Sequence, residues 1–396
     1  MSITIDATAV RPGQAAGLEA FCYGLLDGWA ETDTEIAALV NSADLDNWDR
    51  AVRESVHRTW VPRTASSMAG NRMLHPLKRI LATKYGQGTL SKTMRFARAR
   101  VAHVQSEHTI YYPFHRVPTM AKKSVVTVHD LRVFQASLWS SMDQQIISRN
   151  VSRADAVVAS WPHPYREIRD RFTDARDKTF IIPLPAFSRP PPDWKRLASS
   201  DEPLLLCPAS TAPHKNHEVL LRAVAALPDV RMVCCGPLVE PQASRLQALI
   251  RSLGIDDRVC FPGFVTRRVL DGLFAQADAV VTPTLWEAAS GPLYEALAWG
   301  VPVAASNIPP LTSQARQFGD AVEFFDPMDV KDVRKAIEVV LRESAKRAEL
   351  AWLAGSDIRT REWRDTASNY RRVIEWVQGD GVRPDDLATE TGGVQE

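Results

Sequence analysis

Two carboxylates stand eight residues apart in the segment between Thr284 and Pro302, namely Glu287 and Glu295. The residues around them are mostly apolar, and an ionised carboxylate is seldom placed in such surroundings without a partner. Because a carboxylate accepts hydrogen bonds through both of its oxygens, each group could bind the hydroxyl groups of a ligand. This pattern favours a hydroxyl-binding site over a pair of solvated surface glutamates.

Signals for the start and end of a helix lie around the second glutamate. Ser290 can cap a helix, Pro292 suits its first turn, and Gly300 suits the position just after its end. The main-chain N–H groups of Ser290, Gly291 and Leu293 would then point outward beside the positive end of the helix dipole. Such a helix start predicts a site for a diphosphate or for sugar oxygens.

The elements that must position this segment alternate between strands and helices. In the second half, the pattern predicts strands at 204–207, 232–235, 259–261, 279–281 and 301–305, with helices at 217–227, 240–253, 267–276, 291–299 and 329–343. In the first half, it predicts strands at 1–10, 36–40, 124–128, 154–160 and 179–183, with helices at 18–29, 140–153 and 164–172. Such alternation is typical of βαβ units and parallel sheets. We therefore expect an α/β protein of two Rossmann-like, doubly wound domains, with ligands at the carboxyl ends of the strands in the cleft between them.

A cluster of prolines between residues 183 and 192 separates the two halves, because it can continue neither a helix nor a central strand. We place the linker at about 184–200. The N-terminal domain is then expected at 1–190 and the C-terminal domain at 200–357. A helix at 358–377 is expected to pack back on the first domain, and the polar, acidic residues 378–396 are expected to form a disordered tail.

The composition is that of an ordinary globular chain. Of 396 residues, 45% are hydrophobic and 24% are charged, with a net charge of +1, so the whole-chain charge indicates no particular partner. The first residues lack the basic and apolar regions of a secretory signal, and no stretch of ~18 apolar residues predicts a membrane span. We expect a cytoplasmic protein.

Residues 50–100 differ from the rest because Lys and Arg are interleaved with Trp, Met, Leu, Ile and Phe. Solvated helix faces would explain this composition. A basic and partly apolar surface for an anionic lipid or an acceptor would explain it as well. The second interpretation predicts a peripheral contact with the inner face of a membrane.

Several other chemistries are not supported. The chain has no P-loop motif, no Gly-x-Gly-x-x-Gly dinucleotide motif, no Gly-x-Ser-x-Gly elbow and no zinc-type spacing. Four of its five cysteines, Cys207, Cys234, Cys235 and Cys260, lie in short apolar runs. These runs predict buried strands with reduced core cysteines and neither disulfides nor metal.

The segment from Glu287 to Glu295, followed by Ala-Leu-Ala-Trp-Gly-Val-Pro-Val-Ala-Ala-Ser, resembles the retaining glycosyltransferases of family 4, in the mannosyltransferase-like branch. The resemblance implies the GT-B fold. It implies a sugar-contacting role for Glu287 and binding of the nucleotide ribose by Glu295. The residues between them, Ser290, Gly291, Pro292 and Leu293, would hold sugar and phosphate.

The resemblance extends to Pro213-His214-Lys215-Asn216, between a predicted strand and a helix. It looks like the family's Lys-Asn element, and a cation there would neutralise the leaving diphosphate. The family often has Arg where this chain has His214. A second departure is that a Glu expected soon after Pro310 is absent, since Thr312-Ser313-Gln314 stands there.

Other strand ends carry the resemblance further. Phe261-Pro-Gly263-Phe-Val265 is similar to the family's base-contacting strand end. The remaining donor-site residues implied in this half are Ser210, Thr211 and Gly236. In the first half, Val128-His129-Asp130-Leu131 resembles the family's His-Asp-Leu, which implies that His129 contacts the donor sugar. The loop from Gly13 to Gly17 matches the glycine-bearing loop near acceptor and phosphates.

Taken together, these residues predict a glycosyltransferase that moves a hexose from a nucleotide diphosphate sugar to a glycan or lipid-linked acceptor. Mannose or a deoxyhexose is the preferred sugar, Glu287, His129 and Lys215 are the expected catalytic residues, and no cofactor, metal or nucleic acid is expected. A GT-B sugar-nucleotide epimerase, a phosphorylase, or a non-catalytic sugar-nucleotide-binding subunit are the alternatives.

Overall fold

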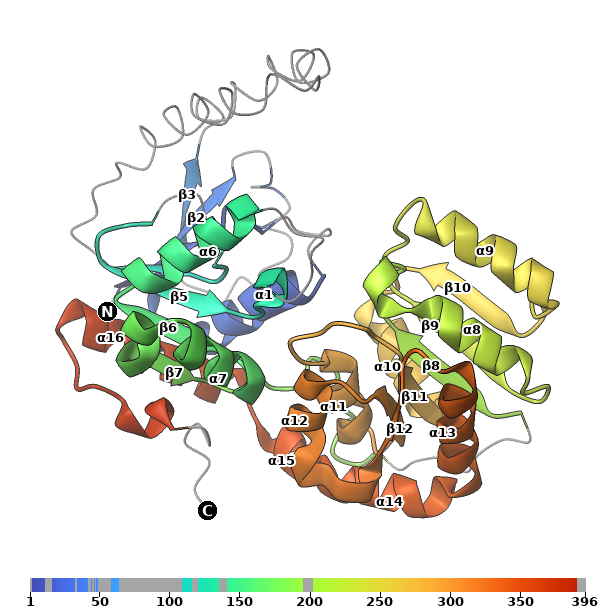
Figure 1. Cartoon of the computed structure of the whole chain (residues 1–396). Helices are drawn as coiled ribbons and strands as arrows, with labels where there is room; N and C mark the ends of the chain where they lie inside the picture. Colours follow the sequence, from blue (N-terminus) through green and yellow to red (C-terminus); the bar gives the residue numbers. More distant parts are fainter. Residues whose placement is uncertain are drawn as a thin grey trace, which may run out of the picture. The chain divides into compact units, whose positions relative to one another are not determined.

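The computed structural model describes residues 2–10, 16–32, 34–41, 44, 46, 48, 58–63, 109–115, 120–134, 141–194 and 202–389. The chain divides into two compact units, which are described separately (Figure 1). Unit 1 comprises residues 1–184 and 362–396, and unit 2 comprises residues 185–361.

A parallel sheet forms the centre of unit 1. Among the described residues it has seven strands in the order β3-β2-β1-β4-β5-β6-β7. Their bounds are β1 Ser2–Asp6, β2 Glu35–Asn41, β3 Arg58–Arg63, β4 Ile110–Tyr112, β5 Ser124–Val128, β6 Ala156–Ala159 and β7 Thr179–Ile181. The central strands are runs of Val, Ala and Tyr that are buried on both faces, as parallel sheets require.

The helices of unit 1 include two that are far apart in sequence and pack together, α1 and α16. The bounds are α1 Ala16–Ala30, η3 Arg132–Phe134, α6 Ser141–Arg153, α7 Pro162–Arg171, η4 Thr173–Lys178, α16 Trp363–Gln378 and η7 Asp385–Ala388. Gly24 and Gly28 allow the close approach, because a Cβ at either position would lie within 2.3 Å of Trp363. The indole N–H of Trp29 donates to the carbonyl of Ala367 at 2.8 Å.

A second parallel sheet forms the centre of unit 2, with six strands in the order β10-β9-β8-β11-β12-β13 in the described part of this unit. The bounds are β8 Leu204–Pro208, β9 Arg231–Cys235, β10 Val259–Gly263, β11 Ala279–Thr282, β12 Val303–Ser306 and β13 Val322–Phe325. Because every pairing is parallel, the carboxyl ends of β8, β9, β10 and β11 lie at the same edge of the sheet.

Helices alternate with these strands. Their bounds are η5 Pro213–Lys215, α8 His217–Ala225, α9 Gln242–Leu253, α10 Arg267–Gln276, α11 Gly291–Ala298, α12 Pro309–Ala315, η6 Arg316–Ala321, α13 Val330–Arg342, α14 Ser344–Ala354 and α15 Ser356–Thr360. Leu220 and Leu221 of α8 and Ile337 of α13 are fully buried in one apolar cluster with Leu205 and Met232 of the sheet. The two parallel sheets with flanking helices confirm the predicted α/β class.

Several boundaries differ from the sequence-based expectation. Strands β3 and β4 were not predicted, and apart from the backbone of β3 the basic segment 50–100 lies outside the described residues. The chain enters unit 2 at Pro185, so residues 185–194 belong to that unit and not to a linker or to the first domain. Ser188 and Trp194 explain this, because the indole of Trp299 donates to the Ser188 hydroxyl at 2.8 Å and its ring packs edge-on against Trp194.

The C-terminal region also differs in two places. The helix expected at 358–377 is interrupted by Arg361 and Glu362, which are extended where the chain passes from unit 2 to unit 1. The expectation of a disordered tail is wrong for residues 379–389. Leu387 is fully buried, Arg372 pairs with Asp386 at 2.6 Å, and the Tyr165 hydroxyl donates to the Ala388 carbonyl.

One predicted core cysteine lies on the surface. Cys260 is exposed because β10 is an edge strand, whereas Cys22, Cys207, Cys234 and Cys235 are buried. Within the described ranges, none of the helices combines the length and apolar character needed to span a membrane.

Candidate active site

Most of the predicted site residues lie in four loops at one edge of the unit 2 sheet. They follow β8, β9, β10 and β11, whose carboxyl ends share that edge. The residues are Ser210, Thr211, His214, Lys215 and Asn216 after β8; Gly236 after β9; Gly263 and Val265 at β10; and Glu287, Ser290, Gly291, Pro292, Leu293 and Glu295 after β11. The parallel topology thus places the loop that carries Lys215 and the loop that carries Glu287 at the same edge of the sheet.

The turn that carries Lys215 is fastened to the loop after β11. The main-chain carbonyl of His214 accepts hydrogen bonds from the Leu285 N–H at 2.8 Å and from the Thr284 hydroxyl at 3.1 Å. Asn216 follows in the left-handed conformation, with φ 55°. Its side-chain amide donates to the Pro327 carbonyl at 2.7 Å. The turn that carries Lys215 is therefore fastened both to the loop after β11 and to the segment after β13.

Lys215 and Glu287 form an ion pair through Nζ and Oε1. Their side chains are only 20% and 12% exposed, so water screens the pair less than it would on the surface. Both line a pocket, together with Cys207, Ser290 and Pro292. This pocket brings a cation and a carboxylate to the start of α11.

The start of α11 confirms the predicted helix signals but not all of the predicted free donors. The Ser290 hydroxyl caps the helix by accepting from the Leu293 N–H at 3.2 Å, and Gly300 adopts φ 63° after the helix. The Ser290 N–H donates to Gln314 at 2.7 Å. The prediction that the amides of Ser290 and Leu293 point out toward a ligand is therefore wrong. A ligand has room to approach the main chain at Gly291, because a Cβ built there would meet no atom within 4 Å.

Gln314 is a site residue that the sequence analysis did not identify. Its carboxamide is 97% buried, and it accepts from the Ser290 N–H while donating to the Ser290 carbonyl at 2.9 Å. It stands in the segment where the family pattern has a Glu. A carboxylate could accept from the N–H but could not donate to the carbonyl, so the amide satisfies both groups of the capping residue.

Glu295 lies one turn into α11 and is 5% exposed. Burial raises the pKa of its carboxyl group, while the guanidinium of Arg267, at 3.2 Å, acts in the opposite direction. The main chain of Ser188 also acts to lower this pKa. Glu295 does not line the pocket that contains Lys215. Its carboxylate is paired with Arg267 instead.

Three predicted binding residues have clear structural tasks. The Thr211 hydroxyl is buried and accepts from the Val239 N–H at 2.6 Å, which joins the loops after β8 and β9. Gly236 has φ 151°, and a Cβ there would lie 2.5 Å from the Ala209 carbonyl oxygen. Gly263 has φ 78°, and its carbonyl accepts from the Gly236 N–H at 2.9 Å. These residues bring the three loops together.

His129 and Gly17 belong to unit 1. The His129 ring follows β5, and its Nε2 lies 3.0 Å from the Pro113 carbonyl, with Nδ1 3.4 Å from the Ser160 hydroxyl. Phe21, one turn after Gly17 on α1, packs edge-on against the ring at 4.7 Å. Burial lowers the pKa of His129 to about 4, although the Pro113 carbonyl and Asp130 oppose the change. The imidazole is therefore neutral at pH 7.

Comparison with known families identifies the part of the chain that holds the pocket. Residues 189–352 match the family model described as glycosyl transferases group 1. The chain contains a glycosyl transferases group 1 domain. This domain covers nearly all of unit 2, including the Lys215–Glu287 pair and α11.

Curated relatives agree with this domain. The chain is 30% identical over 190 residues to the serotype-specific mannosyltransferase WbdA of Escherichia coli, which is 46% of this chain and 23% of WbdA. It is 29% identical over 236 residues to a D-inositol 3-phosphate glycosyltransferase of Xylanimonas cellulosilytica, which is 55% of this chain and 56% of the relative. The chain thus spans about a quarter and about half of these two proteins.

Solved structures resemble the whole chain. Sucrose-phosphate synthase of Thermosynechococcus elongatus superposes with a TM-score of 0.70 and 18% identity, covering 96% of this chain and 99% of that one. Anabaena HepE in complex with UDP and glucose gives a TM-score of 0.67 and 15% identity over 95% and 100% of the two chains. The group 1 domain and unit 1 together therefore have the GT-B fold.

The role of Gln314 can be tested by stability. Replacing Gln314 with Leu leaves the main-chain N–H of Ser290 buried without its partner, so we expect a loss of about 1–3 kcal/mol in unfolding free energy. Urea unfolding measures this loss. Gln276→Leu is the control, because Gln276 is exposed and bonds only within α10. Equal stabilities for both variants would contradict the role of Gln314.

The lowered pKa of His129 predicts a pH dependence of stability. The unfolded imidazole binds a proton near pH 6.5 and the folded one only near pH 4, so stability is complete above pH 6.5 and declines toward pH 4. In His129→Gln this contribution is absent. We expect the stability advantage of wild type over the variant to shrink by about 2 kcal/mol between pH 7 and pH 4.5. Urea unfolding at the two pH values should show this, and a constant difference would exclude it.

Proposed function

We propose that this protein is a retaining glycosyltransferase that moves a hexose from a nucleotide diphosphate sugar to a glycan or lipid-linked acceptor. The observation that carries the proposal is the half-buried Lys215–Glu287 pair beside the start of α11. The cation and the helix N-terminus in this pocket suit the diphosphate of such a donor, and the carboxylate suits its sugar hydroxyls.

The donor would lie along the carboxyl edge of the unit 2 sheet. Its diphosphate would contact Lys215 and the Gly291 N–H, and its sugar would contact Glu287. Its base would lie near Gly263 and Val265, at the end of β10. Its ribose hydroxyls would be bound by Glu295, whose carboxylate is held in place by Arg267. Each part of the donor then meets a group of suitable charge or hydrogen-bonding capacity.

Donor binding would exchange the partners of the ion pair. The ammonium of Lys215 would leave the Glu287 carboxylate for the more highly charged phosphate oxygens. Glu287 would then accept hydrogen bonds from the sugar hydroxyls. The pair thereby keeps both groups stabilised before the donor binds and places them for use when it does.

The chemical step would be assisted mainly by electrostatics. As the glycosidic bond breaks, negative charge accumulates on the diphosphate, and Lys215 with the α11 dipole would stabilise that charge. Attack from the same face, assisted by the leaving phosphate, would retain the anomeric configuration.

Unit 1 would supply the acceptor side. The neutral His129 could exchange its 3.4 Å contact with Ser160 for a hydroxyl of the donor sugar. Gly17, at the exposed start of α1, would leave room for the acceptor or phosphates. His214 would contact the phosphates together with Lys215. Asn216 would contribute by fixing the turn that carries both residues.

We further propose that residues 50–100 contact the inner face of a membrane through their basic and apolar side chains.

Two donors deserve to be tested first. The name of WbdA indicates transfer of mannose by that protein, and HepE binds UDP and glucose. The resemblance of the motifs to the mannosyltransferase-like branch favours GDP-mannose or a related deoxyhexose donor for this chain. UDP-glucose is the comparison.

A thermal-shift screen of nucleoside diphosphates and nucleotide sugars tests donor binding. At ~100 times its dissociation constant, the correct nucleotide should stabilise the protein by about 2.7 kcal/mol. Lys215→Ala should bind it at least ~10-fold more weakly, because a charge-assisted hydrogen bond contributes about 1.5–3 kcal/mol. The control is Lys346→Ala, since Lys346 is exposed on α14.

The screen, together with a turnover assay on the nucleotide that binds, separates the proposal from its rivals. No stabilisation by any nucleotide, or equal affinities of Lys215→Ala and wild type, would contradict the donor site. Release of free sugar without an acceptor would indicate an epimerase, and dependence on inorganic phosphate would indicate a phosphorylase. Binding without turnover of any acceptor would indicate a binding subunit.

The role of Glu287 is tested by Glu287→Gln, which keeps the shape of the side chain but removes its charge. We expect transfer to slow by about 10²-fold or more while the nucleoside diphosphate still binds, because the lost contacts are to the sugar in the transition state. Steady-state kinetics with saturating donor and direct nucleotide binding distinguish the two effects. Glu338→Gln is the matched control, because the Glu338 side chain is 44% exposed and pairs with Arg334 on the same helix, α13. Transfer at the wild-type rate by Glu287→Gln would remove this assignment.

A further inference from the structure

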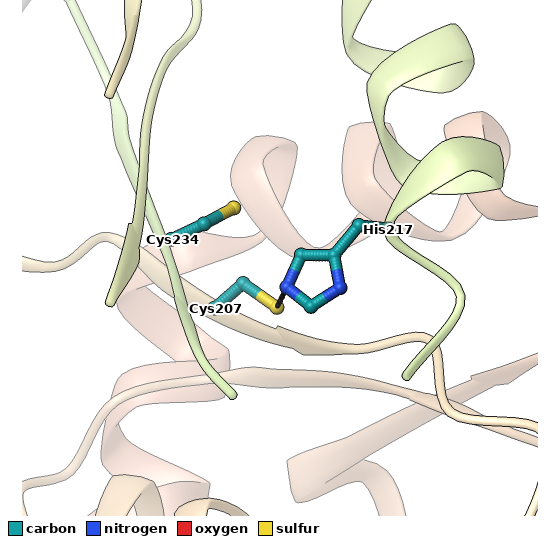
Figure 2. Close-up of side chains that lie close together, drawn as sticks. All are labelled: Cys207, His217 and Cys234. Carbon is teal, nitrogen blue, oxygen red and sulfur yellow. Dashed lines mark hydrogen bonds between the residues drawn. The ribbon is translucent and has the colours of Figure 1, made fainter. Parts of the chain in front are cut away.

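A second group of chemically active side chains lies in the core of unit 2, next to the pocket. Cys207, Cys234 and His217 are each 1% exposed, and their ligand atoms all lie within 4.8 Å of one another. Figure 2 shows the Cys207 sulfur joined to the imidazole by a dashed line, with the Cys234 sulfur nearby. The proposed transfer reaction does not use these three side chains.

The fold brings the three residues together from separate elements. In the parallel register of β8 and β9, Cys207 lies directly opposite Cys234. His217 is the first residue of α8, immediately after the turn that carries Lys215. The intervals of nine and sixteen residues between them do not form a zinc motif, which is why sequence analysis indicated core cysteines and no metal.

The distances suit a thiophilic ion. Zinc binds sulfur at about 2.3 Å and imidazole nitrogen at about 2.0 Å, so two such ligands at a tetrahedral ion are roughly 3.5 Å apart. The Cys207 Sγ and His217 Nε2 atoms are 3.9 Å apart. All three ligand atoms lie within 4.8 Å of one another, so movements of up to about 1 Å would close the site around an ion.

The charges favour a divalent ion. Two thiolates and a neutral imidazole would neutralise a 2+ ion, and a neutral complex suits the apolar cluster that contains both cysteines.

We propose that Cys207, Cys234 and His217 form a buried binding site for a thiophilic divalent cation, for which Zn²⁺ is the natural occupant. Cys207 also lines the pocket that contains Lys215 and Glu287, which gives the ion a route of entry. The bound ion would link β8, β9 and the start of α8, the elements that carry the Lys215 turn. The proposal does not depend on the identity of the donor.

Cobalt provides a direct test, because Co²⁺ bound to thiolates absorbs in the near ultraviolet by charge transfer. The full chain is purified with a chelator and a non-thiol reductant and then titrated with Co²⁺. We expect one ion per chain and a charge-transfer band that Zn²⁺ displaces. The band should weaken in Cys207→Ser and Cys234→Ser and stay intact in Cys260→Ser, where the cysteine is exposed on β10.

A second readout is the melting temperature. Zn²⁺ should raise it by several degrees in wild type and Cys260→Ser but not in Cys207→Ser. Circular dichroism establishes that each variant is folded, and the wild-type titration does not depend on any variant. Absence of the band in folded wild type would overturn the proposal, as would a band that persists at full strength in the Cys207→Ser, Cys234→Ser double variant.

Discussion

The attraction between the ammonium of Lys215 and the carboxylate of Glu287 is the interaction on which the candidate site depends. The two groups are 72 residues apart in sequence, and they meet because β8 and β11 are parallel neighbours that end at one edge of the sheet. The hydrogen bonds that the His214 carbonyl accepts from Thr284 and Leu285 fix the two loops to each other. Partial burial keeps the pair strong, and it also makes either group costly to leave without a partner, so a ligand that separates them must supply charges of its own.

Behind this pair lies a layer of buried polar groups that holds the helix start rigid. Gln314 satisfies both main-chain groups of Ser290, whose hydroxyl in turn caps α11. Glu295 is fixed by Arg267 one turn further along. Binding groups placed on a helix and supported by buried hydrogen bonds keep their geometry better than groups on a free loop, which matters where charge must be stabilised at a fixed point.

The sequence predicted those features that depend on neighbouring residues. The Ser290 cap, the Gly300 conformation and the alternation of strands and helices are local, and the structure confirms them. The sequence alone could not predict contacts between segments that are distant along the chain. Gln314 meets Ser290 across 24 residues, Cys207 meets Cys234 through sheet register, and the two amides expected to face a ligand are used inside the protein. Residues 379–389 look polar and unstructured in sequence, but their apolar Leu387 finds a buried position on unit 1.

A crystal structure of the protein in complex with its preferred nucleoside diphosphate would test the central claim most directly. The account predicts that the Lys215 ammonium lies within hydrogen-bonding distance of a phosphate oxygen and no longer contacts Glu287, with the phosphates beside Gly291 at the start of α11. A complex in which Lys215 still contacts Glu287, while the nucleotide occupies another part of the chain, would contradict it.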